Sequence, residues 1–98
     1  MSELTNIMKA ATENMLNIVK DYRGDLATFN SNMEEKIKET EKNLEEIKRN
    51  WNDSNFDNFN KIVKDKLKKL KDEIDRSKKL EKVIADTEKD FKDALAEL

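Results

Sequence analysis

The amino-acid sequence predicts an all-α protein, an antiparallel two-helix hairpin that is expected to dimerise into a four-helix bundle. Three observations support this fold class. The 98 residues include no proline and one glycine, apolar residues recur every three or four positions, and one cluster of turn-forming residues lies at mid-chain. Proline and glycine interrupt helices, so their near absence favours a few long helices. We expect a single domain, residues 1-98, with a helix at about 3-50, a turn at about 51-54 and a helix at about 55-97.

The first helix is predicted by an apolar stripe whose steps average about 3.6 residues, the helical repeat. Ser2 is a suitable N-cap, and Glu3 suits the positive end of the helix dipole. Gly24 lies opposite the stripe, which continues past it in phase, so we expect one helix. The stripe comprises Leu4, Met8, Ala11, Met15, Ile18, Tyr22, Leu26, Phe29, Met33, Ile37, Thr40, Leu44, Ile47 and Trp51.

The turn is predicted at the segment NWNDSN, residues 50–55, where two N-caps are possible for the second helix. With Asn52 as N-cap, Trp51 and Phe56 have the spacing of a hydrophobic staple. With Ser54 as N-cap, Asp57 completes an acidic capping box. The second stripe has a mean step of about 3.5, close to a coiled-coil seam. It comprises Phe56, Phe59, Val63, Leu67, Leu70, Ile74, Ser77, Leu80, Ile84, Thr87, Phe91, Leu95 and Leu98.

Charge supports the same pairing of the two helices. Residues Lys61–Lys71 include six lysines, and the hairpin places them beside residues 34–46, which include six glutamates. Exposed ion pairs contribute little energy each, so they select the register rather than supply stability. Core packing is the expected role of Tyr22 and of the methionines on the first stripe, which are Met8, Met15 and Met33.

Two helices cannot bury a stripe much wider than their shared seam, so apolar residues beside the seam predict a partner. These flanking positions form the predicted partner interface. They are Ile7, Val19, Ile62, Val83, Ala85 and Ala94. We expect two hairpins to assemble through them, as a homodimer or a heterodimer.

The composition argues against catalysis. There is no cysteine or histidine, which removes thiol, imidazole and common zinc chemistry, and no carboxylate pair is marked out as an acid–base couple. We predict no enzyme activity and no catalytic residue, cofactor or metal site. Residues 1–19 do not have the pattern of a signal peptide, and no segment is apolar enough to span a bilayer. The expected location is the cytoplasm, or outside the cell by a route without a cleaved signal.

The lysine run Lys61–Lys71 has two interpretations. The simpler is a solvated helix face, neutralised by the glutamates of the first helix. The alternative is a membrane-surface or scaffold coiled-coil protein that uses the run to bind anionic lipid. Nucleic-acid binding is not expected, because Phe56 and Phe59 fall on the apolar stripe and offer no stacking platform among the lysines.

The turn residues suggest a family. A chain of about one hundred residues with Trp51-Asn52-Asp53 between two long helices, followed by Phe56 and Phe59, resembles the WXG superfamily of type VII secretion. These proteins are small helical hairpins with W-x-G at the turn and an apolar residue about eight positions later. Asp53 replaces the glycine, which fits if that position is a helix cap. The turn motif is therefore Trp51, Asp53, Phe56 and Phe59.

The resemblance implies a function. The family's export signal is an aromatic residue followed four positions later by Asp or Glu, but here Phe91 is followed by Leu95. The chain thus resembles the WXG-like partners of LXG-type toxins, which rely on another protein for the signal. It implies a dimerising targeting partner or co-secreted subunit, bound to a second copy or to the helical N-terminal domain of an effector. It also implies that the Trp51 tip either faces the secretion machinery or stabilises the turn.

Overall fold

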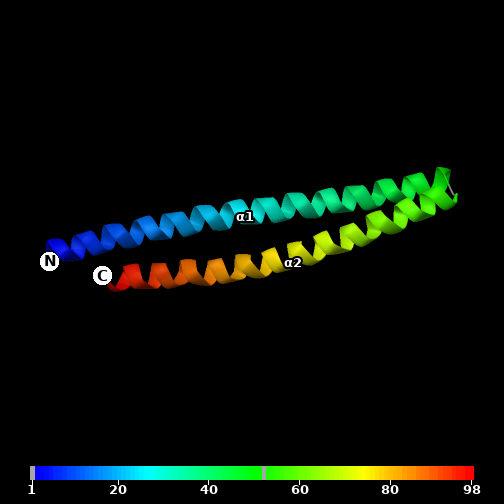
Figure 1. The fold of residues 1–98 in the computed structure, drawn as a ribbon. Coiled ribbons are helices and arrows are strands. Elements are labelled where there is room, and N and C mark those ends of the chain that lie inside the picture. The colour runs from blue at the N-terminus through cyan, green and yellow to red at the C-terminus, as the bar shows by residue number, and fades with distance from the viewer. Residues whose placement is uncertain (1, 52) are drawn as a thin grey trace. The chain divides into compact units, whose positions relative to one another are not determined.

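The computed structural model describes residues 2–51 and 53–98, which form two antiparallel α-helices and, within these ranges, no strand (Figure 1). Helix α1 spans Glu3–Asn50 and helix α2 spans Ser54–Glu97. The predicted hairpin is therefore confirmed, with boundaries within one residue of those expected. Dimerisation stays a prediction.

The contacts divide the hairpin into two compact units, where the sequence predicted one domain. The terminal unit contains residues 2–28 of the N-terminal side and residues 78–98 of the C-terminal side. The turn unit contains Phe29–Ser77. We describe each unit by itself.

Helix α1 begins at the predicted cap. The backbone N–H of Thr5 donates to Ser2 Oγ over 3.2 Å, which satisfies one of the free donors of the first turn. At the other end, Lys48 and Arg49 lie in the last turn, where cations favour the negative end of the helix dipole. The backbone N–H of Trp51 still donates to the Ile47 carbonyl, at 2.8 Å.

Helix α2 begins differently from prediction, because Asp53 is its N-cap. Its Oδ1 accepts from the Phe56 backbone N–H at 2.9 Å, and its carbonyl accepts from the Asp57 N–H at 3.0 Å. Ser54 lies inside the helix, so its proposed role as N-cap is wrong. The alternative cap, Asn52, lies outside the described residues. A carboxylate serves as well as a hydroxyl at an N-cap, and its charge adds a favourable interaction with the dipole.

The core of the turn unit matches the predicted stripes. Ile37 and Leu44 of α1 pack with Leu67 and Ile74 of α2, and all four are buried. Met33 and Val63 are half-buried against this cluster. Leu70, which was also predicted in the core, is 42% exposed.

In the terminal unit, contact between the helices follows a strict seven-residue repeat, which we call the seam. Every buried or half-buried position of α1 in this unit lies on it. The α1 seam positions are Thr5, Lys9, Thr12, Leu16, Val19, Arg23 and Leu26. The α2 positions are Glu81, Ile84, Glu88, Phe91, Leu95 and Leu98.

The seam therefore departs from the predicted first stripe, and most of that stripe in this unit is exposed. Met8, Met15 and Tyr22 were expected in the core but are 45%, 42% and 52% exposed. The reason is geometric. A stripe that repeats every 3.6 residues drifts by about 20° per heptad from a contact line that repeats every 3.5, or about 80° over four heptads. The two patterns coincide at Ile37 and Leu44 and separate toward the N-terminus.

Substituting Gly24 by alanine should raise the free energy of unfolding by about 0.5–1 kcal/mol. Gly24 is exposed, its φ is not positive, and a Cβ there would meet nothing within 4 Å. Urea unfolding measures the change. Ala10→Gly, two heptads earlier and also exposed, is the matched control and should lower the free energy by a similar amount. A destabilising Gly24→Ala would contradict this account of the helix.

The same substitution at two isoleucines of the turn unit tests the core. Ile37→Val should cost about 1 kcal/mol, because Ile37 is 5% exposed and the removed methylene leaves a void. Ile62→Val should cost less than about 0.5 kcal/mol, because Ile62 is 62% exposed. Equal losses in urea unfolding would show that the observed core is wrong.

Candidate protein-binding surfaces

One flank of the terminal unit presents an unpaired apolar surface, which we call the apolar face. On α1 it repeats with steps of three and four residues, as a helix–helix seam does. Its α1 members, all exposed, are Leu4, Met8, Ala11, Met15, Ile18 and Tyr22. Its α2 members, also exposed, are Leu80, Val83 and Ala94. Ile18 is 68% exposed and Leu4 65%, so these side chains lack the cover that seam residues have.

The α1 and α2 members lie on the same flank of the hairpin. Each helix contributes two seam rows. The residue that follows a member of one row in the sequence lies on one flank of the hairpin, and the residue that precedes a member of the other row lies on the opposite flank. Ala27, Lys78 and Ala85 belong to the first kind, and they line one groove together. In an antiparallel pair, the residues of α1 and α2 that precede a seam residue in this way therefore share the other flank. Tyr22 of α1 and Leu80 of α2 are residues of that kind.

Polar groups occupy the seam beside this face. Glu88 is buried and meets Arg23, whose Nη2 donates to Glu88 Oε1 at 3.3 Å. Arg23 Nε lies 2.9 Å from Oε2 as a charge contact, without the alignment of a hydrogen bond. Thr12, also buried, donates its hydroxyl to the Met8 carbonyl at 2.8 Å. The terminal unit thus places several polar side chains between its helices and apolar side chains in solvent.

The predicted interface residues fall in four places. Ile7, Val83 and Ala94 lie on or beside the apolar face, and all three are exposed. Val19 is half-buried in the seam. Ala85 lines the groove on the opposite flank, and Ile62 is an exposed residue of the turn unit.

The four residues of the turn motif are brought together at the hairpin tip. The Trp51 indole N–H donates to Asp53 Oδ2, and the Trp51 and Phe56 ring centroids are 6.4 Å apart. Phe56 in turn lies 6.5 Å from Phe59. Phe56 is 1% exposed, whereas Trp51 and Phe59 are each about half exposed, so the tip has a buried anchor and two open aromatic faces. Ile47 and Asn55 complete a small groove there.

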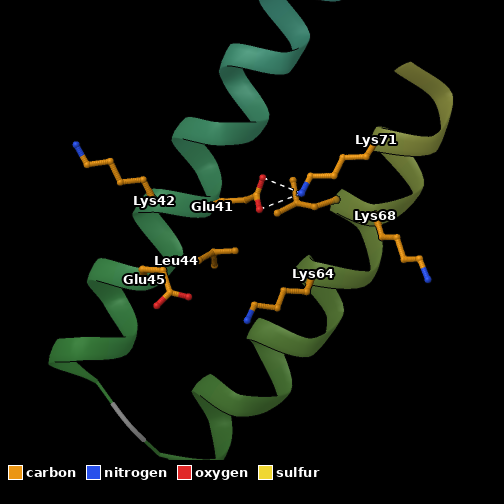
Figure 2. A pocket seen from close by; sticks show the side chains of 8 residues that line it. Glu41, Lys42, Leu44, Glu45, Lys64, Lys68 and Lys71 are labelled. Atoms are coloured by element: carbon orange, nitrogen blue, oxygen red, sulfur yellow. Dashed lines mark hydrogen bonds and ion pairs between the residues drawn. The ribbon is translucent and has the colours of Figure 1, made fainter. Parts of the chain in front are cut away.

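The lysine run forms part of a second groove in the turn unit, shown in Figure 2. Leu44 and Leu67 line it from opposite helices, and Lys64, Lys68 and Lys71 line its α2 side. Lys71 Nζ lies 3.0 Å from each carboxylate oxygen of Glu41, as the dashed lines show (Figure 2). Lys69 pairs with Asp65 of its own helix at 3.4 Å. The predicted matching of lysines with glutamates is therefore confirmed at Lys71 and Glu41.

Sequence reasoning missed the Arg23–Glu88 pair and assigned the α1 members of the apolar face, and Leu80 of α2, to the core. The seven-residue repeat appears in the burial of residues 9, 16, 23, 30, 37 and 44 of α1 and of residues 60, 67, 74, 81 and 88 of α2. Hydropathy obscures this repeat, because it includes Lys9, Arg23, Glu81 and Glu88.

Comparisons with protein families, with curated proteins and with solved structures find no match to this chain. Among the described residues, neither helix has a stretch long and apolar enough to cross a membrane.

Asp53 should make the hairpin lose stability in acid. Its pKa lies below the ordinary value of 3.8, mainly because the Phe56 backbone N–H donates to the carboxylate, with a further hydrogen bond from the Trp51 indole. The folded state therefore favours the ionised form. The resulting stability is fully present above pH 3.8 and disappears as the pH falls through the lower, folded-state pKa.

The measurement is the thermal unfolding midpoint of the natural chain and of Asp53→Asn, followed by circular dichroism from about pH 7 to about pH 2. Asparagine keeps a capping acceptor and removes the charge. The natural chain should be the more stable at neutral pH, and the difference should shrink below pH 3.8. A difference that stays constant with pH would rule out a role for the ionised carboxylate.

Proposed function

We propose that this chain is a non-catalytic helical hairpin that binds another helical protein through its apolar face. The proposal rests on a row of exposed apolar side chains in heptad spacing. The row consists of Leu4, Met8, Ala11, Met15 and Ile18. Alternating steps of four and three residues are the spacing of a helix–helix seam. A membrane-surface helix has similar spacing but is rich in lysine and arginine on its polar face, whereas Asp21 and Asp25 lie beside this row. Two such faces brought together make a four-helix bundle.

The turn supports the more specific proposal of a WXG-like subunit of a type VII secretion system. Trp51 and Phe59 have the family's spacing, and Asp53 acts as a helix cap, the condition under which it can replace the glycine. In this proposal the chain is a dimerising targeting partner or co-secreted subunit of an effector. The half-exposed Trp51 and Phe59 rings offer a surface for the secretion machinery, while Phe56 anchors the turn.

The route and location follow from the same proposal. Leu95 stands where the family's export signal would have an acidic residue after Phe91, so the effector supplies the signal. The chain then acts in the cytoplasm, or leaves the cell with its partner by the type VII route.

The alternative of a membrane-surface protein is less well supported. Lys71 pairs with Glu41 and Lys69 with Asp65, which reduces the charge available to lipid. The leucines beside the lysine groove, Leu44 and Leu67, are buried in the helix–helix core and cannot enter a bilayer surface. Vesicle co-sedimentation that requires anionic lipid and is lost in high salt would favour the alternative.

The proposal is tested by sedimentation of the full chain, alone and mixed with the helical N-terminal domain of an LXG-type toxin from the same organism. We expect a stable assembly of helices in at least one case. Ile18→Ser should weaken it about tenfold or more, because the lost contact is worth roughly 1.5–3 kcal/mol when buried. Helicity should be retained, because Ile18 is 68% exposed in the hairpin.

Ser31→Ala, at an exposed position of α1 outside the apolar face, is the control and should leave the assembly unchanged. A chain that stays monomeric and binds no helical partner would exclude the proposed function.

A further inference from the structure

Carboxylates surround the apolar face. The seven-residue repeat places Asp25 in the row of Ile18, and Asp90 in the row of Val83. The row beyond these on each helix, which faces away from the seam, holds Asp21 on α1 and Lys79, Asp86 and Asp93 on α2. The charged residues of these rows, all exposed, are Asp21, Asp25, Lys79, Asp86, Asp90, Asp93 and Glu97. We call this group the acidic rim; it contains six carboxylates and one lysine.

The opposite flank of the terminal unit has the reverse charge. The two rows of each helix beside the seam on that flank include five lysines and two glutamates, whereas the matching two rows on the apolar flank include Asp25, Asp90 and Glu97 and no lysine. The lysines and glutamates of the opposite flank are Glu3, Glu13, Lys20, Lys78, Lys82, Lys89 and Lys92. The chain as a whole has a net charge of only -2, so the rim reflects a separation of charge between two flanks rather than an acidic composition.

We infer that the apolar face binds a helix of a different protein, one whose apolar seam is flanked by lysine or arginine, and not a second copy of this chain. The inference rests on the proposed function and specifies the partner. Two copies joined through this face would bring the Asp25, Asp90 and Glu97 carboxylates of one copy against those of the other, with no lysine in the same rows to offset them. Like charges facing one another across an interface oppose association, whereas basic flanks would both attract and orient the partner.

The chain's own lysine run cannot serve as that partner. Residues Lys61–Lys71 are basic, but Val63 and Leu67 pack into the core of the turn unit. Only Ile62 and Leu70 remain exposed there, which is too few for a seam that repeats every three or four residues. Charge complementarity and apolar spacing therefore do not occur together on a second copy.

The test uses the full chain and two fluorescently labelled synthetic helices that share one leucine–isoleucine heptad seam. One probe has lysine at the flanking positions and the other has glutamate. Fluorescence anisotropy should show that the lysine-flanked probe binds about tenfold or more tightly than the other in low salt. The difference should shrink as salt screens the charges. Sedimentation in the same low-salt buffer should show that the chain alone is monomeric.

Two variants with the same change in net charge test whether the probe preference comes from the acidic rim or from the net charge of the whole chain. Asp21→Asn, Asp25→Asn and Asp90→Asn, combined, should reduce the preference for the lysine-flanked probe about tenfold and allow the chain to self-associate more readily. Glu35→Gln, Glu45→Gln and Glu46→Gln, combined, are exposed changes in the turn unit and should leave the preference unchanged. Ile18→Ser keeps every rim charge and should weaken the binding of both probes about tenfold or more.

Equal affinity for the two probes, or a low-salt dimer of the chain that Ile18→Ser disrupts, would overturn the inferred partner and leave the proposed function standing. Failure of both probes to bind a monomeric chain would overturn the inference and the proposed function together.

Discussion

The arrangement of this protein depends on the seven-residue repeat of contact between α1 and α2. A pair of helices that meet every 3.5 residues can bury only two rows of side chains on each helix. In the turn unit those rows hold Ile37 and Leu44 facing Leu67 and Ile74, and burial of these side chains supplies the hydrophobic stabilisation. In the terminal unit the same rows hold Arg23 and Glu88 beside apolar residues such as Leu16, and a second set of apolar residues falls outside them.

This distribution gives the two units different roles. Glu88 is buried but the Arg23 side chain is 42% exposed. Such a pair gains little more than the cost of removing its charges from water, so the contact favours one pairing of the helices more than it adds stability. It fixes which residues of α2 lie beside α1, and therefore which side chains share the apolar face. Apolar side chains in heptad spacing, left in solvent, are a surface whose burial against a further helix would release the stabilisation that the hairpin alone does not gain.

The reversal between the helices is organised around Asp53. Its carboxylate accepts the Phe56 backbone N–H, which begins α2, and the Trp51 indole N–H, which holds the ring beside the start of that helix. Phe56 is buried under this arrangement while Trp51 and Phe59 remain half exposed. One short segment thus both ends α1 and presents aromatic side chains, so the fold and a binding surface rely on the same residues.

The sequence by itself determined the helices, the position of the turn and the core of the turn unit. Helical periodicity, the lack of proline and the cluster of turn formers are local signals, and local signals are sufficient for boundaries such as Asn50 and Ser54. The clustering of Trp51, Phe56 and Phe59 also followed from their spacing. The choice of Asp53 as cap could not be predicted, because asparagine, aspartate and serine compete as N-caps within three consecutive positions.

Only the tertiary structure decided which rows of α1 meet α2. Hydropathy alone could not reveal that Met15 and Tyr22 are exposed while Arg23 lies in the seam, because the apolar stripe and the contact line have different periods, and the line along which the two helices touch is a property of the pair.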